Sequence, residues 1–267
     1  MKTAWPKVLI TDETLRDGLQ IEREGVTVNP KWSPQMGDTL RLVERLRPVP
    51  GVEFFALALN ERGREDRRRH APPLSLEPLP ATHLHMCETF LQRNTNQTME
   101  GQERIWRTPV DKARAAGATQ AAVGLSAGWG SNWSGKFTQA ARLDALQRQV
   151  DAWNGAGIEV KRVDLADPMA WNTPLEVASD LEAIKRRFPS IDVFHLHLHN
   201  ARGMAMLSMY EALKLLEASD TLVADTALGG IGGCPYCGNG QATGMIPTED
   251  FVQLLQVLGM DAGIDLG

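Results

Sequence analysis

The segment His195–Asn200, HLHLHN, places three of the chain's six histidines at alternating positions. Side chains two residues apart point to the same face of a β-strand, so these imidazoles would line one side of it. His197 and His199 have the spacing of two ligands to one divalent metal ion, and Asp17 could add a carboxylate oxygen from another strand. Such donors suit Mg²⁺, Mn²⁺ or Zn²⁺. The alternative is a pair of hydrogen-bonded core histidines, which is the interpretation we favour for His195.

Cys234 lies in a glycine-dense segment, GGIGGCPYCGNG, that follows the last expected strand. A glycine-rich loop can approach a ligand closely, and a thiol on it could donate or accept a proton. The alternative is that Cys234 and Cys237 form a C-x-x-C redox or zinc pair, which needs its own structural context. The chain has only three cysteines, too few for a disulfide framework, so we treat them as thiols.

The elements that must position these residues alternate along the 267-residue chain, which is 43% hydrophobic. Expected strands are Val8–Thr11, Val52–Leu59, His83–Cys87, Gln120–Leu125, Glu159–Leu165, Val193–His199 and Thr221–Thr226, with Gly25–Pro30 as a short eighth. Expected helices are Pro34–Leu46, Met99–Ala116, Thr138–Ala156, Pro174–Phe188, Arg202–Ala218 and Thr248–Leu258. NTPLEV and IPTEDF each offer a threonine cap to a helix.

This alternation predicts an α/β fold, a (β/α)₈ TIM barrel in a single domain over residues 1–267. The first βα unit is expected to be shortened or irregular, because residues 13–25 show no helical apolar stripe and are few for a parallel crossover. In such a barrel the active site lies at the carboxyl ends of the strands, where Asp17, Asp167, His199 and Cys234 would converge.

The formal net charge of −5 argues against a non-specific nucleic-acid binder. The basic run Glu61–His70 is mixed with acids and is typical of a solvated helix face. No apolar run reaches the length of a membrane span, and the N-terminus lacks the apolar segment of a signal peptide. We therefore expect a cytoplasmic protein that works on neither membranes nor nucleic acids.

The motifs TDETLRDGLQ, HLHLHN and GGCPY, in this order, resemble the metallolyase superfamily of (β/α)₈ barrels that contains isopropylmalate synthases and 3-hydroxy-3-methylglutaryl-CoA lyase. The C-terminal segment PTEDFVQLLQVLGMDAGIDL resembles the lyase branch. The resemblance implies that Asp17, His197 and His199 bind the catalytic divalent cation and that Arg16 steadies an enolate. It further implies an acyl-CoA substrate and a homodimer.

The same resemblance makes Cys234 the general acid/base, places Gln20 beside the substrate, and lets Asp167 orient or deprotonate the substrate hydroxyl. Three features depart from it. The H-x-H motif continues with Asn200 instead of the lyases' aspartate, which is closer to the synthases. Met245 stands at the lyases' fourth metal ligand, where Asn239 could substitute. The region of the first outer helix and second strand is shortened.

The residues and the resemblance together favour a carbon–carbon lyase that cleaves a 3-hydroxyacyl-CoA thioester to acetyl-CoA and a keto acid, with Mg²⁺ or Mn²⁺ as the expected cofactor and Zn²⁺ as an alternative. A metal-bound enolate would also serve an aldolase or Claisen-type synthase acting on a hydroxy or keto acid. A third hypothesis is a degenerate barrel that binds a ligand without catalysis.

Overall fold

The computed structural model describes residues 2, 4–18, 39–57, 61–76, 79–234, 237 and 244–267. The chain divides into two compact units, one formed by Met1–Ile21 with Pro80–Gly267 and the other by Glu22–Leu79. In the part of the chain that the structure describes, no helix combines the length and the apolar character that crossing a membrane requires.

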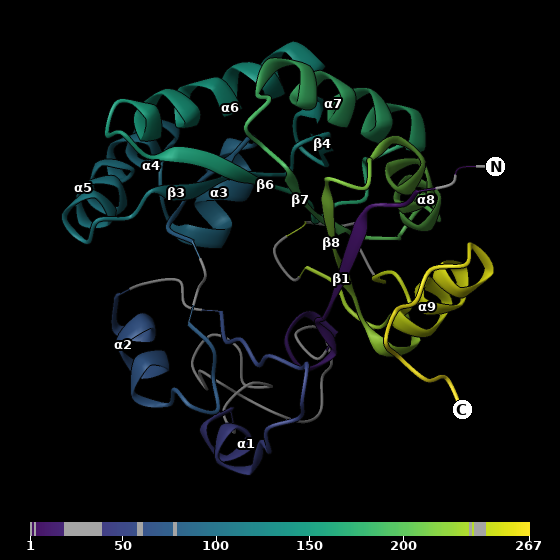
Figure 1. Ribbon diagram of the computed structural model, residues 1–267. Helices are drawn as coiled ribbons and strands as arrows, with labels where there is room; N and C mark the ends of the chain where they lie inside the picture. The colour runs from purple at the N-terminus through teal and green to yellow at the C-terminus, as the bar shows by residue number, and fades with distance from the viewer. Residues whose placement is uncertain are drawn as a thin grey trace. The chain divides into compact units, whose positions relative to one another are not determined.

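The first unit is built on a parallel sheet of six strands whose order is β1-β8-β7-β6-β3-β2 (Figure 1). The strands are β1 (Lys7–Asp12), β2 (Ala81–His85), β3 (Gln120–Ser126), β6 (Glu159–Asp167), β7 (Val193–Leu198) and β8 (Thr221–Thr226). All six correspond to predicted strands. Their parallel pairing brings their carboxyl ends to one edge, where the chemistry-bearing residues were expected.

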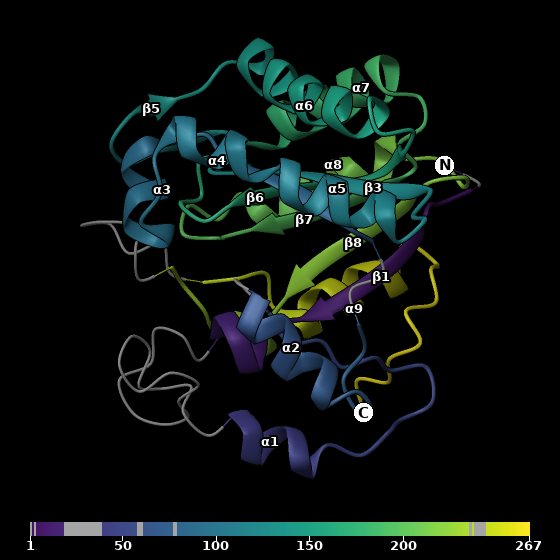
Figure 2. The same cartoon turned by 90° about the vertical axis from the view of Figure 1, so that its left-hand side faces the viewer.

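Helices connect the strands of this sheet, and the last helix, α9, follows the final strand β8. They are α3 (Glu88–Thr95), α4 (Met99–Ile105), α5 (Arg107–Ala115), α6 (Gln139–Asn154), α7 (Pro174–Arg187), α8 (Ala205–Leu215) and α9 (Thr248–Val257). A short antiparallel pair, β4 (Gly130–Ser131) and β5 (Gly135–Lys136), lies between β3 and α6. Helices α6 and α7 run side by side over the sheet (Figure 2).

Two predicted helix features differ from the structure. The predicted helix Met99–Ala116 is interrupted at Trp106, because Pro109 has no N–H to donate to the carbonyl of Ile105. The predicted threonine cap of the last helix is wrong: Pro247 is the N-cap, and the Thr248 hydroxyl instead donates to Asp12 Oδ2 at 2.8 Å. The predicted cap of α7 is confirmed, since Thr173 Oγ1 accepts from the Glu176 amide at 3.4 Å.

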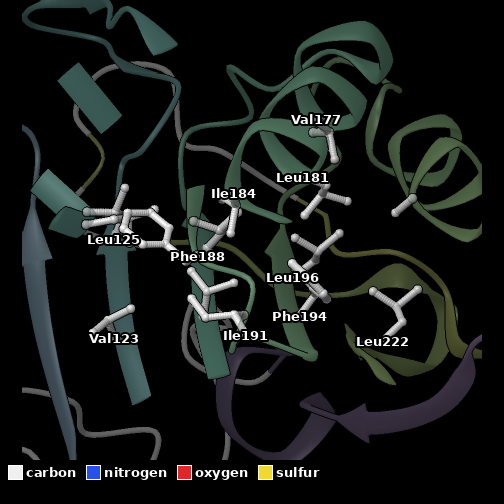
Figure 3. Packing of buried hydrophobic residues seen from close by; sticks show 14 of the residues in the cluster. Val123, Leu125, Val177, Leu181, Ile184, Phe188, Ile191, Phe194, Leu196 and Leu222 are labelled. Atoms are coloured by element: carbon white, nitrogen blue, oxygen red, sulfur yellow. The ribbon is translucent and has the colours of Figure 1, made fainter. Parts of the chain in front are cut away.

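Side chains along β7 alternate between buried apolar residues and histidines, and this alternation decides where the histidines point. Phe194, Leu196 and Leu198 are fully buried and belong to the main hydrophobic core under the helices. Figure 3 shows Phe194 and Leu196 in this core together with apolar side chains of α7. Because successive strand side chains point to opposite faces, His195 and His197 must lie on the other, inner side of the sheet.

The first βα unit is irregular, as predicted. Strand β1 runs directly into a five-residue π-helical turn, Thr14–Gly18. Single π-turns are rare and are frequently found at functional sites. Here the turn carries both Arg16 and Asp17.

The described part of the second unit contains two helices, α1 (Thr39–Arg45) and α2 (Glu61–Arg69). The predicted strand Val52–Leu59 is reduced, in its described part, to a single bridge between Phe54 and Leu74. The predicted short strand Gly25–Pro30 lies outside the described residues. Helix α2 carries the basic run as predicted, although Arg67 is buried and donates from Nη1 to the Ala56 carbonyl at 3.0 Å.

Candidate metal centre

The structure brings together the three residues whose types and spacing predicted metal binding. Asp17 comes from the π-turn after β1, His197 from β7, and His199 from the segment directly after β7. One ligand atom of each lies within 4.8 Å of the other two. His197 Nε2 is 3.1 Å from His199 Nε2, and His199 Nε2 is 3.6 Å from Asp17 Oδ2. This cluster lies at the carboxyl end of the sheet.

The cluster fits a divalent cation by the chemistry of its donors. Asp17 and His199 are 3% and 1% exposed, so a carboxylate and an imidazole are both buried at the same place. Two imidazole nitrogens facing each other with a carboxylate oxygen form a nitrogen–oxygen donor set, which suits Mg²⁺, Mn²⁺ or Zn²⁺. An ion between them would compensate the desolvation of Asp17.

Asp225, at the end of β8, accepts a hydrogen bond from each of two histidines, and sequence reasoning did not select it as a site residue. Its Oδ2 is 2.9 Å from His197 Nδ1, and its Oδ1 is 2.6 Å from His195 Nε2. A proton on Nδ1 of His197 leaves the Nε2 lone pair directed at the cluster, as in carboxylate–histidine–metal arrangements. Burial alone would raise the pKa of Asp225, but the two imidazoles lower it well below its usual range.

His195 is a hydrogen-bonded imidazole one layer below the cluster, which confirms the prediction. It contacts Asp225 and also Asp164, whose Oδ1 is 3.1 Å from His195 Nδ1. Burial by itself would lower the pKa of His195, but the two carboxylates raise it to about 10. Both ring nitrogens are engaged, Nε2 with Asp225 and Nδ1 with Asp164 and with Nη2 of Arg162 at 2.6 Å, so His195 supports the site through Asp225.

We expect Asp225→Asn to lower metal affinity about 10- to 100-fold, because outer carboxylates that orient histidine ligands contribute effects of that size. The measurement is Mn²⁺ titration by calorimetry. Asp192→Asn is the matched control, since Asp192 is exposed just before the same strand as His197. Equal affinities in the Asp225→Asn variant and the wild type would show that Asp225 does not orient His197.

Arg16 lies beside the cluster and is anchored by two carboxylates. Its Nε donates to Glu13, and its Nη1 lies 3.3 Å from Asp17 Oδ1. The Arg16 side chain remains 29% exposed, so the guanidinium borders both the cluster and solvent. It can therefore present a fixed positive charge to a molecule bound at the metal centre.

Asp167 is the last residue of β6. One of its carboxylate oxygens is hydrogen-bonded and, within the described part of the chain, the other is not. Its Oδ2 accepts from the Asn172 amide at 2.5 Å and from Asn172 Nδ2 at 2.7 Å. Its Oδ1 is buried and has no hydrogen-bond partner among the described residues. Burial raises the pKa of Asp167 above its ordinary value, although the bonds from Asn172 oppose that rise. A buried carboxylate with a raised pKa and one oxygen without a hydrogen-bond partner is suited to accept a proton.

The glycine loop after β8 contacts the cluster directly. The amide of Gly233 donates to Asp17 Oδ2 at 3.2 Å. Gly232 has a φ of +136°, and a Cβ on it would lie 2.9 Å from Asp17 Oδ2 and 2.8 Å from Met245 Cγ. Only glycine allows this approach. Met245, at the position expected for a fourth ligand, is thus buried beside Asp17.

Cys234 follows this loop and is buried in a cluster with Cys87, Phe90, Met169 and Cys237. The thiol of Cys237 donates to the Pro168 carbonyl at 3.1 Å. A hydrogen bond with Cys234, together with burial, raises the pKa of Cys237 far above its ordinary value. Among the described residues, the one group of histidine, cysteine and carboxylate side chains close enough to share a metal ion is Asp17, His197 and His199, so nothing there adds ligands to Cys234 and Cys237 for a zinc site. Gln20 and Asn239 lie outside the described residues.

A parallel α/β sheet with candidate metal ligands at the carboxyl ends of its strands has the arrangement in which barrel enzymes of this class carry their active sites. The HMGL-like family model matches residues 81–267, and the chain belongs to this family of carbon–carbon lyases. The chain is 28% identical over 261 residues to the hydroxymethylglutaryl-CoA lyase of Pseudomonas mevalonii, covering 97% of this chain and 80% of that protein. It is 27% identical over 260 residues to the lyase YngG of Bacillus subtilis, covering 97% and 81%.

Solved structures agree with this assignment. The HMG-CoA lyase of Bacillus subtilis superposes with a TM-score of 0.74 at 25% identity, covering 98% of this chain and 90% of that chain. An HMG-CoA lyase from Acinetobacter baumannii, in complex with coenzyme A and 3-methylmalate, gives a TM-score of 0.74 at 23% identity, covering 100% and 88%. The predicted TIM-barrel fold is therefore confirmed.

Proposed function

We propose that this chain is a divalent-metal-dependent lyase of the 3-hydroxy-3-methylglutaryl-CoA lyase type, which cleaves a 3-hydroxyacyl-CoA thioester to acetyl-CoA and a keto acid. The observation that carries the proposal is the convergence on Asp17, whose carboxylate meets His199, Arg16 and the glycine loop that leads to Cys234. Three distant parts of the sequence thus meet at this carboxylate, and the third of them, the glycine loop, continues directly into Cys234.

Each residue has a distinct task in such a cleavage. Breaking a C–C bond beside a thioester needs the 3-hydroxyl proton removed, and we assign this step to Oδ1 of Asp167, which has no hydrogen-bond partner among the described residues. The bonding electrons then form the enolate of acetyl-CoA, whose oxyanion Arg16 stabilises. The Cys234 thiol delivers a proton to the enolate carbon and releases acetyl-CoA.

The proposed metal ligands are Asp17, His197 and His199. When bound there, a divalent ion such as Mg²⁺ or Mn²⁺ would supply Lewis-acid polarisation of the substrate's hydroxyl and carbonyl oxygens. Arg16 contacts Asp17, so a substrate bound at these three side chains would lie next to the Arg16 guanidinium.

A CoA thioester is the proposed substrate class because a lyase of the same fold was solved with coenzyme A and the dicarboxylate 3-methylmalate. The test is release of free acetyl-CoA from a panel of branched 3-hydroxyacyl-CoA thioesters with Mg²⁺ or Mn²⁺. Inertness toward all thioesters combined with turnover of a free hydroxy-keto acid would favour the aldolase. Absence of both metal binding and turnover would favour the ligand-binding barrel.

If Asp167 is the base, kcat/KM falls as pH decreases through its pKa, because only the carboxylate accepts a proton. The fall lies at higher pH than the ordinary value for an aspartate, since burial raises this pKa. The Asn172 side chain opposes that rise, so Asn172→Ala is expected to move the acid limb to still higher pH. The measurement is the pH profile of kcat/KM at saturating Mn²⁺, and an unmoved acid limb would assign it to another group.

A further inference from the structure

Arg202 is an exposed arginine in the loop after β7, three residues beyond His199. Its Nη1 donates to the carbonyls of Met169 at 2.9 Å and Ala170 at 2.6 Å, in the segment that follows Asp167. The chain length between His199 and Arg202 limits their Cα separation to roughly 11 Å. Arg202 is therefore held at the same edge of the sheet as the metal centre.

An aromatic platform fixes the plane of this guanidinium. The Arg202 Cζ lies 4.8 Å from the centre of the Trp171 ring. The indole is itself held, because Trp171 Nε1 donates to Asn132 Oδ1 at 3.1 Å and Asn132 Nδ2 donates to the Cys237 carbonyl at 2.9 Å. Four loops, which follow β3, β6, β7 and β8, thus contribute to the stacked pair and its support.

The remaining donors of Arg202 face no acceptor in the described part of the chain. The carbonyl bonds engage Nη1 alone, so Nε and Nη2 keep their N–H groups available. No carboxylate of a described residue forms an ion pair with Arg202, although the chain carries a net charge of −5. A stacked guanidinium with free, coplanar N–H donors matches the geometry of a carboxylate or a phosphate.

We propose that Arg202, stacked on Trp171, binds an oxyanion of the substrate. The oxyanion is either the free carboxylate of the acyl part or a phosphate of coenzyme A, which share this chemistry. The inference rests on the proposed function, because a CoA thioester of a hydroxy acid supplies both groups. Arg202 acts here in substrate binding and takes no part in proton transfer.

The experiment compares the full-length wild type with Arg202→Met, which keeps the unbranched stem, and Arg202→Lys, which keeps the charge. We expect Arg202→Met to raise KM about 10- to 100-fold with kcat changed less than about 3-fold, and Arg202→Lys to lie between. Arg93→Met is the matched control, since Arg93 is an exposed arginine over another indole, Trp133, at 5.0 Å. Circular dichroism and a thermal melt verify that each variant is folded. If Arg202→Met does not fold, the comparison is made with Arg202→Lys.

Two binding titrations separate the sources of the oxyanion and do not depend on turnover. Weaker binding of a free 3-hydroxydicarboxylate to Arg202→Met identifies the acyl carboxylate, and weaker binding of free coenzyme A identifies a phosphate. Unchanged affinity for both, or an equal loss in Arg93→Met, would overturn the inference. An inactive wild type that still loses ligand affinity on Arg202→Met would contradict the proposed function and leave the oxyanion site supported.

Discussion

Replacing His197 with alanine is expected to remove tight divalent-metal binding and to lower kcat by about three orders of magnitude or more. The reason is that His197 Nε2 and His199 Nε2 face each other at 3.1 Å, so both would bind the same ion. Asp17 and His199 alone would leave it with two protein ligands. The measurements are metal content after dialysis, Mn²⁺ titration by calorimetry, and kcat at saturating substrate.

The competing interpretation, a core histidine that only holds the fold together, makes a different prediction. Under it, His197→Ala would lower the thermal midpoint while the remaining folded protein bound Mn²⁺ as the wild type does. His85→Gln is the matched control, because His85 is a histidine at the end of β2 that burial keeps neutral by lowering its pKa to about 3. We expect that variant to bind metal normally, since His85 has no ligand atom in the cluster.

Replacing Cys234 with serine is expected to lower kcat by about 10²- to 10⁴-fold while leaving substrate affinity nearly unchanged. A serine hydroxyl is a much weaker acid than a thiol, so the proton that completes acetyl-CoA is delivered slowly. The measurement is steady-state kcat and KM for acetyl-CoA release, together with calorimetric titration of coenzyme A.

Cys237→Ser is the matched control for this variant, because Cys237 occupies the same buried cluster three residues later. Its thiol donates to the Pro168 carbonyl, a bond that a serine hydroxyl can also make. We expect kcat within a few-fold of the wild type. Equal losses in both variants would show that the two cysteines act through the packing of the loop and that Cys234 is not the proton donor.

The sequence by itself determined the elements that depend on neighbouring residues. Strand β7 shows its two faces in the letters VFHLHL, and the cap at Thr173 is specified by the residues beside it. These signals are local because strand alternation and helix capping involve side chains only a few positions apart. The same locality explains why His197 and His199 could be recognised as a pair before any fold was known.

The metal cluster was partly predictable for a second reason. Carboxyl ends of parallel strands meet at one edge, so Asp17 and Asp167 could be placed near the histidines from the expected barrel alone. The sequence pattern did not predict the break between α4 and α5 at Trp106, because the apolar spacing continues across both helices. Pro109 is the residue that signals this break. The Trp106 indole shows why the break is tolerated, since its Nε1 donates to the His83 carbonyl at 3.0 Å.

Only the tertiary structure decided which side chains support the cluster. Asp225 lies 28 positions from His197, and Gly233 lies 216 positions from Asp17. The bond between Asp225 and His197 depends on the register of β7 against β8 and on the depth of each side chain in the barrel. A one-residue shift in register would turn these groups to the opposite face, and no local pattern in either segment records the register that the packed core selects.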